Sequence, residues 1–151
     1  MGFIKIWIHF VWTVKNREPR LIKDVKTKVI SHIQENAKGK DIYIDSIGGG
    51  KEHLHLLISL NAKQSISEVV QLLKGESSFW INSADIVVGK FSWQDKYFAV
   101  SVSESVLPSV RKYIQNQEEH HRVKPFLEEY NEFFGSVKIT GSERAVMSCV
   151  I

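Results

Sequence analysis

The chain has 151 residues, of which 43% are hydrophobic and 25% are charged, and its formal net charge at pH 7 is +3. These are ordinary values for one soluble globular domain with a sizeable core. The sequence has no run of about 18 apolar residues, so we expect no membrane-spanning helix. The single cysteine, Cys149, rules out an internal disulfide framework and suits a reducing cytoplasm.

The first part of the chain predicts a strand, a basic loop and a helix. Residues 3–14 alternate between one apolar face and a second face that carries Lys5, Trp7, His9 and Thr13. Residues 15–20 (KNREPR) form a basic loop that Pro19 interrupts. Residues 21–38 have apolar side chains at helical spacing and end at Gly39, a helix stop signal.

The middle of the chain predicts a β-hairpin followed by a helix. Residues 41–47 and 53–60 read as strands that the glycines at 48–50 separate. Residues 65–82 read as a helix capped by Ser65, with Glu68 completing a capping box. The remaining expected elements are a fourth strand, a third helix and a short fourth helix, at 93–103, 106–121 and 125–134.

This order, β-α-β-β-α-β followed by helices, predicts an α+β, ferredoxin-like antiparallel sheet with additional C-terminal helices. Both connecting helices then lie on one face of the sheet, and a C-terminal helix can cover the other face. We expect a single domain at 1–134 and a peripheral or disordered tail at 135–151, where the sequence shows no clear period.

Two histidines share one face of the expected third strand. Side chains alternate along a strand, so His53 and His55 point to one side while Leu54 and its even-numbered neighbours form core on the other. Two imidazoles at this spacing can hold one metal ion. The alternative is a pair of polar residues on a partly exposed strand face.

A second group lies on the expected third helix, where positions four apart are neighbours. This spacing places Tyr113, with its hydroxyl, beside the amide of Gln117. Gln117 could add a neutral oxygen to the two imidazoles, leaving positions that phosphate oxygens can fill, and imidazole ligands favour manganese-type ions over magnesium. A Tyr113 phenolate could attack a phosphodiester, although a tyrosine on such a helix is more often core or interface. The same helix carries further candidate ligands, which could instead form only a polar helix end. They are Glu118, Glu119, His120 and His121.

Several basic and aromatic residues are candidate nucleic-acid contacts. Lys15, Arg17 and Arg20 could grip phosphates, or could belong to a solvated turn. Trp93 and Tyr97 could stack on unpaired bases, but buried aromatics of the fourth strand are the favoured interpretation.

Five stretches in this order resemble the HUH-type single-tyrosine transposases of the insertion-sequence 200/605 group, within the REP-associated tyrosine transposase-like superfamily. They are WTVKNREPRLI, GGGKEHLHLLISL, SISEVVQLLKGESS, FSWQDKYFAVSVSES and VRKYIQNQEEHH. The resemblance covers residues 3 to about 133. It adds Lys74, of the lysine-glycine pair in the third stretch, to the candidate DNA contacts.

The resemblance implies a specific chemistry. His53, His55 and Gln117 would bind a divalent metal ion, Mg²⁺ or Mn²⁺, and Tyr113 would be the nucleophile. The protein would cleave and rejoin single-stranded DNA at hairpin-flanked element ends through a 5′-phosphotyrosine. It would act as a homodimer with composite active sites, in the cytoplasm of a bacterial or archaeal cell.

Two other functions stay open on the sequence. One is a catalytically inactive, domesticated or truncated protein that binds hairpin DNA or RNA. The other is an unrelated metal-dependent hydrolase, which would not need Tyr113 near the metal. A single-stranded RNA binder on the same fold would carry aromatic residues where His53 and His55 lie, so the sequence argues against it.

Overall fold

Four antiparallel strands form one sheet in the order β2-β3-β1-β4 in the computed structural model, which describes residues 2–117. The strands are β1 (Trp7–Thr13), β2 (Tyr43–Gly49), β3 (His53–Ser59) and β4 (Phe98–Val102). The helices are α1 (Asp24–Gly39), α2 (Ile66–Ser83) and α3 (Leu107–Gln115), with short 3-10 turns η1 (Lys15–Arg17) and η2 (Glu104–Val106). This strand order and connectivity confirm the predicted α+β, ferredoxin-like fold.

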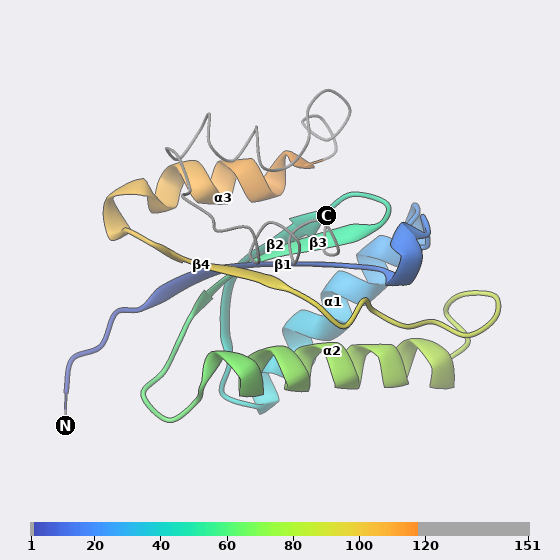
Figure 1. The fold of residues 1–151 in the computed structure, drawn as a ribbon, viewed down its shortest axis with the longest axis horizontal. Helices are drawn as coiled ribbons and strands as arrows, with labels where there is room; N and C mark the ends of the chain where they lie inside the picture. The colour runs from blue at the N-terminus through green and yellow to red at the C-terminus, as the bar shows by residue number, and fades with distance from the viewer. Residues whose placement is uncertain (1, 118–151) are drawn as a thin grey trace.

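The main core lies between the sheet and the two connecting helices, which both pack on the same face (Figure 1). The even-numbered residues of β1 and β3 point into this layer, as the alternation predicted. Helices α1 and α2 bury residues at spacings of three and four against them. The fully buried side chains of this layer include those of Phe10, Trp12, Leu54, Leu56 and Ile81.

Local signals set the start of each connecting helix. Ser65 caps α2, its hydroxyl oxygen accepting a hydrogen bond from the backbone N–H of Glu68 at 3.2 Å, which confirms the predicted cap. Helix α1 begins at Asp24, three residues later than expected, because Lys23 has a positive φ of 47° and cannot belong to a right-handed helix.

Two strands begin at other residues than the sequence predicts. The first strand begins at Trp7 rather than residue 3, and residues 3–6 are largely exposed. The fourth strand begins at Phe98 rather than Trp93, which forms only a single bridge to Val14. Between Trp93 and Phe98, the carbonyls of Gln94 and Asp95 accept hydrogen bonds from the Lys74 ammonium.

Helix α3 covers the opposite face of the sheet, over β2 and β3 (Figure 1). Its contact with the sheet is a second, smaller apolar cluster that includes Leu57, Val110 and Ile114. Gly48 allows this close approach, because a Cβ at that position would overlap the carbonyl oxygen of Ile114. The sequence predicts that Gly48 belongs to a break between two strands. In the structure it lies inside β2 and lets α3 approach the sheet closely.

An ion pair fixes the same helix to the sheet. The Arg111 guanidinium donates from Nε to Asp45 Oδ1 at 2.8 Å and from a terminal nitrogen to Oδ2 at 2.9 Å. Asp45 reaches Arg111 because it is the extra residue of a β-bulge between Ile44 and Ser46. These bonds hold the pKa of Asp45 below its usual value, and Asp45 in turn raises the pKa of Arg111.

Several expectations fall outside the described residues. They concern the third helix beyond Gln117, the helix at 125–134, the tail at 135–151 and the alternative ligands between 118 and 121. Within residues 2–117, none of the helices is both long enough and apolar enough to span a lipid bilayer.

Candidate active site

Three histidines gather on the side of the sheet that α3 covers. His53 and His55 come from β3, and His9 comes from the neighbouring strand β1. The ring centroids of His53 and His55 are 4.9 Å apart, and those of His9 and His55 are 5.2 Å apart. The predicted side of the sheet is therefore confirmed, since both β3 histidines point away from α1 and α2.

Tyr113 of α3 lies against these histidines. Its ring meets those of His55 and His9 edge-on, with centroid distances of 5.6 Å and 6.3 Å. The residue is 3% exposed and also belongs to the apolar cluster beneath α3. The core interpretation of Tyr113 is therefore confirmed, and the same side chain borders the histidines. Its role as a nucleophile stays a prediction.

Gln117 completes the group from just beyond the end of α3. Its side-chain Oε1 lies 3.3 Å from Nε2 of His53, and its Nε2 donates to the backbone carbonyl of Tyr113 at 3.0 Å. The four-residue spacing therefore brings the Gln117 amide to the tyrosine, as expected, but to its main chain rather than its hydroxyl. The Tyr113 ring turns instead towards His9 and His55.

The distance between two of the predicted donor atoms is compatible with a shared divalent ion. Two ligands at right angles around an ion with bonds of about 2.1 Å lie about 3.0 Å apart, close to the separation of His53 Nε2 and Gln117 Oε1. Two imidazoles and an amide suit manganese and related ions. Within residues 2–117 no three His, Cys, Asp or Glu side chains form a metal-binding group, so a site here depends on the glutamine.

Both β3 histidines make a further side-chain contact through Nδ1, the ring nitrogen on the other side from Nε2. Nδ1 of His55 lies 3.0 Å from Nε2 of His9, and Nδ1 of His53 lies 3.2 Å from Oε1 of Glu52. His9 is fully buried, and this burial lowers its pKa to about 3, so His9 is neutral at pH 7. The sequence places His9 on the predicted first strand but indicates no role for it. Only the pairing of β1 with β3 brings it to His55.

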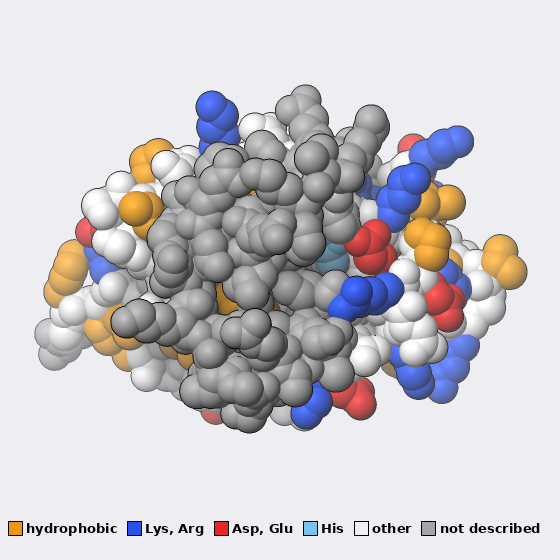
Figure 2. Space-filling model, turned by 45° about the horizontal axis from the view of Figure 1, so that its top comes forward, with side chains coloured by type: hydrophobic (Ala, Val, Ile, Leu, Met, Phe, Trp, Pro, Cys, Tyr) orange, Lys and Arg blue, Asp and Glu red, His pale blue; other side chains and the backbone are white. Residues whose placement is uncertain are grey.

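The basic loop lies at the His53 end of the site. Thr13, the last residue of β1, pairs with His53, and the exposed Lys15 and Arg17 follow directly. Figure 2 shows a histidine on this face with acidic and basic side chains around it. Arg20 instead binds the backbone carbonyl of Val88 at 2.6 Å and the Glu18 carboxylate at 3.1 Å, which gives it a structural role.

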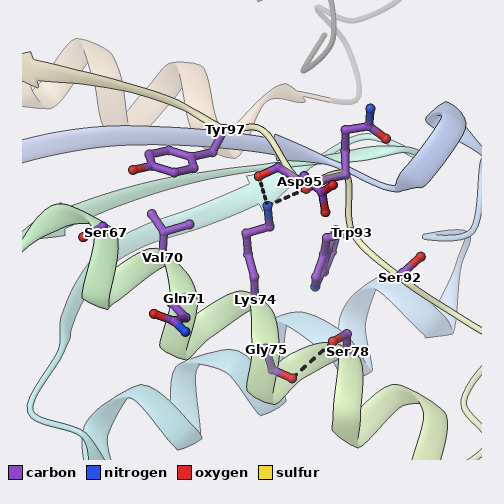
Figure 3. Close-up of a pocket in the computed structure, with 11 residues that line it drawn as sticks. Ser67, Val70, Gln71, Lys74, Gly75, Ser78, Ser92, Trp93, Asp95 and Tyr97 are labelled. Carbon is purple, nitrogen blue, oxygen red and sulfur yellow. Dashed lines mark hydrogen bonds between the residues drawn. The ribbon is translucent and has the colours of Figure 1, made fainter. Parts of the chain in front are cut away.

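Lys74 and the aromatic candidates lie elsewhere, around a cavity of about 360 Å³ between α2 and residues 92–97 (Figure 3). The Lys74 ammonium is directed at the backbone carbonyls of Gln94 and Asp95, and burial lowers its pKa. Trp93 is buried and donates to the Ser77 hydroxyl at 2.9 Å, which supports the core interpretation. This cavity is on the α2 side of the sheet, away from the histidines.

Comparisons with known proteins agree on one family. The profile of the family described as "Transposase IS200 like" matches residues 3–117. The ISDra2 transposase TnpA of Deinococcus radiodurans is 27% identical over 114 residues, covering 72% of this chain and 81% of that protein.

Two solved structures share the fold. A crystal structure at 1.90 Å of a candidate transposase from Deinococcus radiodurans R1 superposes with a TM-score of 0.64 at 24% identity, covering 78% of this chain and 95% of that one. A REP-associated tyrosine transposase bound to a REP hairpin superposes with a TM-score of 0.57 at 15% identity, covering 77% and 68%.

Proposed function

Because the chain belongs to the family of IS200-like transposases, whose members cut and rejoin DNA, we propose that it acts on single-stranded DNA through a covalent bond to Tyr113. The observation that carries this proposal is the meeting of Tyr113, His55 and His53 on one face of the sheet, with Gln117 beside them. A tyrosine buried only for packing would not require this polar company.

The proposed cleavage step is a transesterification. The Tyr113 phenol loses its proton, and its oxygen forms a bond to the phosphorus of a phosphodiester. The bond from phosphorus to the 3′ oxygen breaks, and that oxygen takes up a proton as a free 3′ hydroxyl. The 5′ end is now a phosphotyrosine, so a later attack by a 3′ hydroxyl can rejoin DNA without ATP.

His53, His55 and Gln117 would hold the metal ion, Mg²⁺ or Mn²⁺. When bound, such an ion supplies a Lewis acid that offsets the charge developing on the phosphate. The three protein ligands are neutral when they bind, so the phosphate itself supplies the negative charge the site lacks. The phosphate would lie between these ligands and the tyrosine ring, and the apolar cluster around Leu57 would exclude water from one side.

The proposed substrate is single-stranded DNA with hairpin-flanked ends. Support comes from the fold shared with a transposase bound to a REP hairpin. Lys15 and Arg17 are the best-placed phosphate contacts, because they are exposed and follow the strand that pairs with His53. Arg20 and Lys74 are already engaged by backbone carbonyls, so their contribution to DNA binding is expected to be smaller.

We expect the protein to act as a homodimer. An element has two ends, each phosphotyrosine holds one 5′ end, and so two copies of Tyr113 are the minimum for strand exchange. In one chain α3 docks on its own sheet, and the same contacts can form between two chains to give composite sites. Mixing Tyr113→Phe and His53→Ala chains tests this, since only sites built in trans regain cleavage. A strictly monomeric, cleaving protein would rule out the dimer.

The direct test of the function uses single-stranded oligonucleotides from both flanks of the gene, incubated with the protein and Mn²⁺. We expect a protein–DNA adduct that survives denaturation. Tyr113→Phe should abolish the adduct while retaining hairpin binding, and the matched control Tyr43→Phe, on an exposed tyrosine of β2, should leave it unchanged. Hairpin binding without any adduct from the wild-type protein would instead indicate a non-catalytic binding protein.

A further inference from the structure

We propose that His9 and Glu52 are positioning residues that hold His55 and His53 in the tautomer needed for metal binding. The proposal rests on the metal site of the proposed function and extends it to two residues that lie behind the ligands. Its basis is a shared pattern: each β3 histidine directs Nδ1 at a neighbouring side chain, His9 for His55 and Glu52 for His53.

The pattern is clearest at His53. Its Nδ1 faces the Glu52 carboxylate at 3.2 Å while its Nε2 faces Gln117 Oε1 at 3.3 Å. A carboxylate can only accept, so Nδ1 carries a proton. The Gln117 oxygen also only accepts, so Nε2 would offer its lone pair when a metal ion lies between these two atoms. A ligating imidazole commonly donates its second ring N–H to a carboxylate in this way, which orients the ring and increases its basicity. The site side of His53 is therefore the side suited to a metal.

His55 has the same arrangement with a different acceptor. Its Nδ1 lies 3.0 Å from Nε2 of His9, so one of these atoms must donate and the other accept. A neutral imidazole has one nitrogen with a lone pair, and His9 directs Nε2 at His55. If His9 accepts, Nδ1 of His55 carries the proton and Nε2 of His55 is the nitrogen available to a metal. If His9 donates, His55 would be protonated on Nε2 and could not bind a metal through that atom.

The positions of the two acceptors make them independent. Glu52 lies next to His53 in the chain, at the hairpin between β2 and β3, whereas His9 is in the middle of β1. Neither residue belongs to the ion pair of Asp45 and Arg111 that fixes α3, and His9→Phe keeps a ring beside Tyr113. A change at one acceptor should therefore alter one histidine only, and each variant serves as the control for the other.

The experiment begins with the metal-free protein labelled with ¹⁵N. Long-range ¹H–¹⁵N spectra should show a proton on Nδ1 of both His53 and His55. In His9→Phe, which keeps a ring of similar size but removes the acceptor, His55 should change its tautomer while His53 does not. In Glu52→Ala the reverse should hold. Finding His55 protonated on Nε2 in the wild-type protein would overturn the assignment for His9.

The second measurement is Mn²⁺ affinity by electron paramagnetic resonance. His9→Phe and Glu52→Ala should each bind Mn²⁺ roughly 10- to 100-fold more weakly. His9→Gln and Glu52→Gln, which restore an accepting oxygen, should recover most of the loss. The control His32→Gln alters a histidine that pairs with Glu76 on the other side of the sheet, and it should not change the affinity.

Different results would contradict the positioning roles of His9 and Glu52 and the proposed function of the protein. If the wild-type protein binds Mn²⁺ and forms the DNA adduct but folded His9→Phe and Glu52→Ala bind the ion as well as wild type, the positioning roles are wrong and the function stands. If His9→Phe does not fold, His9→Gln and the wild-type tautomer decide the matter. If the wild-type protein neither binds Mn²⁺ nor forms the adduct, the proposed function and the positioning roles fail together.

Discussion

The two faces of the sheet are both buried, but by different kinds of side chain. On the face covered by α1 and α2, β1 and β3 contribute only apolar residues, among them Phe10, Leu54 and Leu56. On the face covered by α3, the same two strands contribute His9, His53 and His55 next to a few apolar residues. One pair of strands therefore carries a packing face and a chemical face, separated only by the alternation of side chains.

The difference shows where stability is given up for function. Burying a polar ring costs free energy unless it is hydrogen-bonded, and the histidines meet this cost through Glu52, Gln117 and each other. The apolar face needs no such partners. The chemical face also depends on a single helix, α3, whose docking requires Gly48 and the Asp45–Arg111 pair.

The largest expected effect contrasts two residues of β3 that lie on opposite faces of the sheet. Leu56→Ala removes a fully buried apolar side chain, so it should lower the free energy of unfolding by about 2–5 kcal/mol. His53→Ala, on the other face, should cost roughly half as much or less. Urea unfolding measures both, and at a temperature where both variants are folded only His53→Ala should lose adduct formation. Equal losses of stability would mean that the two faces are one kind of core.

A middle-sized effect is expected at the close approach of α3. Gly48→Ala places a Cβ against the Ile114 carbonyl, which should cost about 1–3 kcal/mol and displace Tyr113 from the histidines. The matched control Gly39→Ala, at the end of α1, meets nothing within 4 Å. We expect Gly48→Ala to reduce adduct formation more than Gly39→Ala at equal occupancy of the folded state. A fully active Gly48→Ala would show that α3 need not dock as closely as the structure shows.

The smallest effect concerns the ion pair and its pH dependence. Asp45→Asn should lower the free energy of unfolding slightly at pH 7, because it removes the charge that pairs with the partly exposed Arg111. The folded-state pKa of Asp45 is depressed by Arg111 and by the Ser46 hydroxyl. Its contribution is therefore present above the unfolded pKa of about 3.9 and is lost as pH falls through the lower folded value. Wild type and Asp45→Asn should thus converge in stability towards pH 3, and a difference that grew on acidification would contradict this sign.

The sequence predicts the packing face better than the chemical face. Strict alternation in β1 and β3 is enough to assign Leu54 and Leu56 to the core and His53 and His55 to the opposite side. The ferredoxin-like order follows from the succession of short periodic segments. These are local patterns, so a single sequence contains them in full.

The features that the sequence does not predict depend on contacts between segments that are distant in the chain. The bulge that presents Asp45 to Arg111 comes from a register shift, and the contact of His9 with His55 joins residues 46 apart in the chain. The sequence offers Arg20 and Lys74 as candidate DNA contacts, yet each donates to backbone carbonyls of the segment between α2 and β4. Neither periodicity nor composition encodes such pairings.

The central claim is that the chemical face cuts DNA with Tyr113, and mapping the covalent bond tests it most directly. The wild-type protein is incubated with single-stranded DNA from the gene's flanks and Mn²⁺, digested with nuclease and trypsin, and analysed by mass spectrometry. We predict a nucleotide remnant on the peptide that begins at Tyr113, after cleavage at Lys112. Cleaved DNA with the remnant on another residue, or with no remnant at all, would contradict the account.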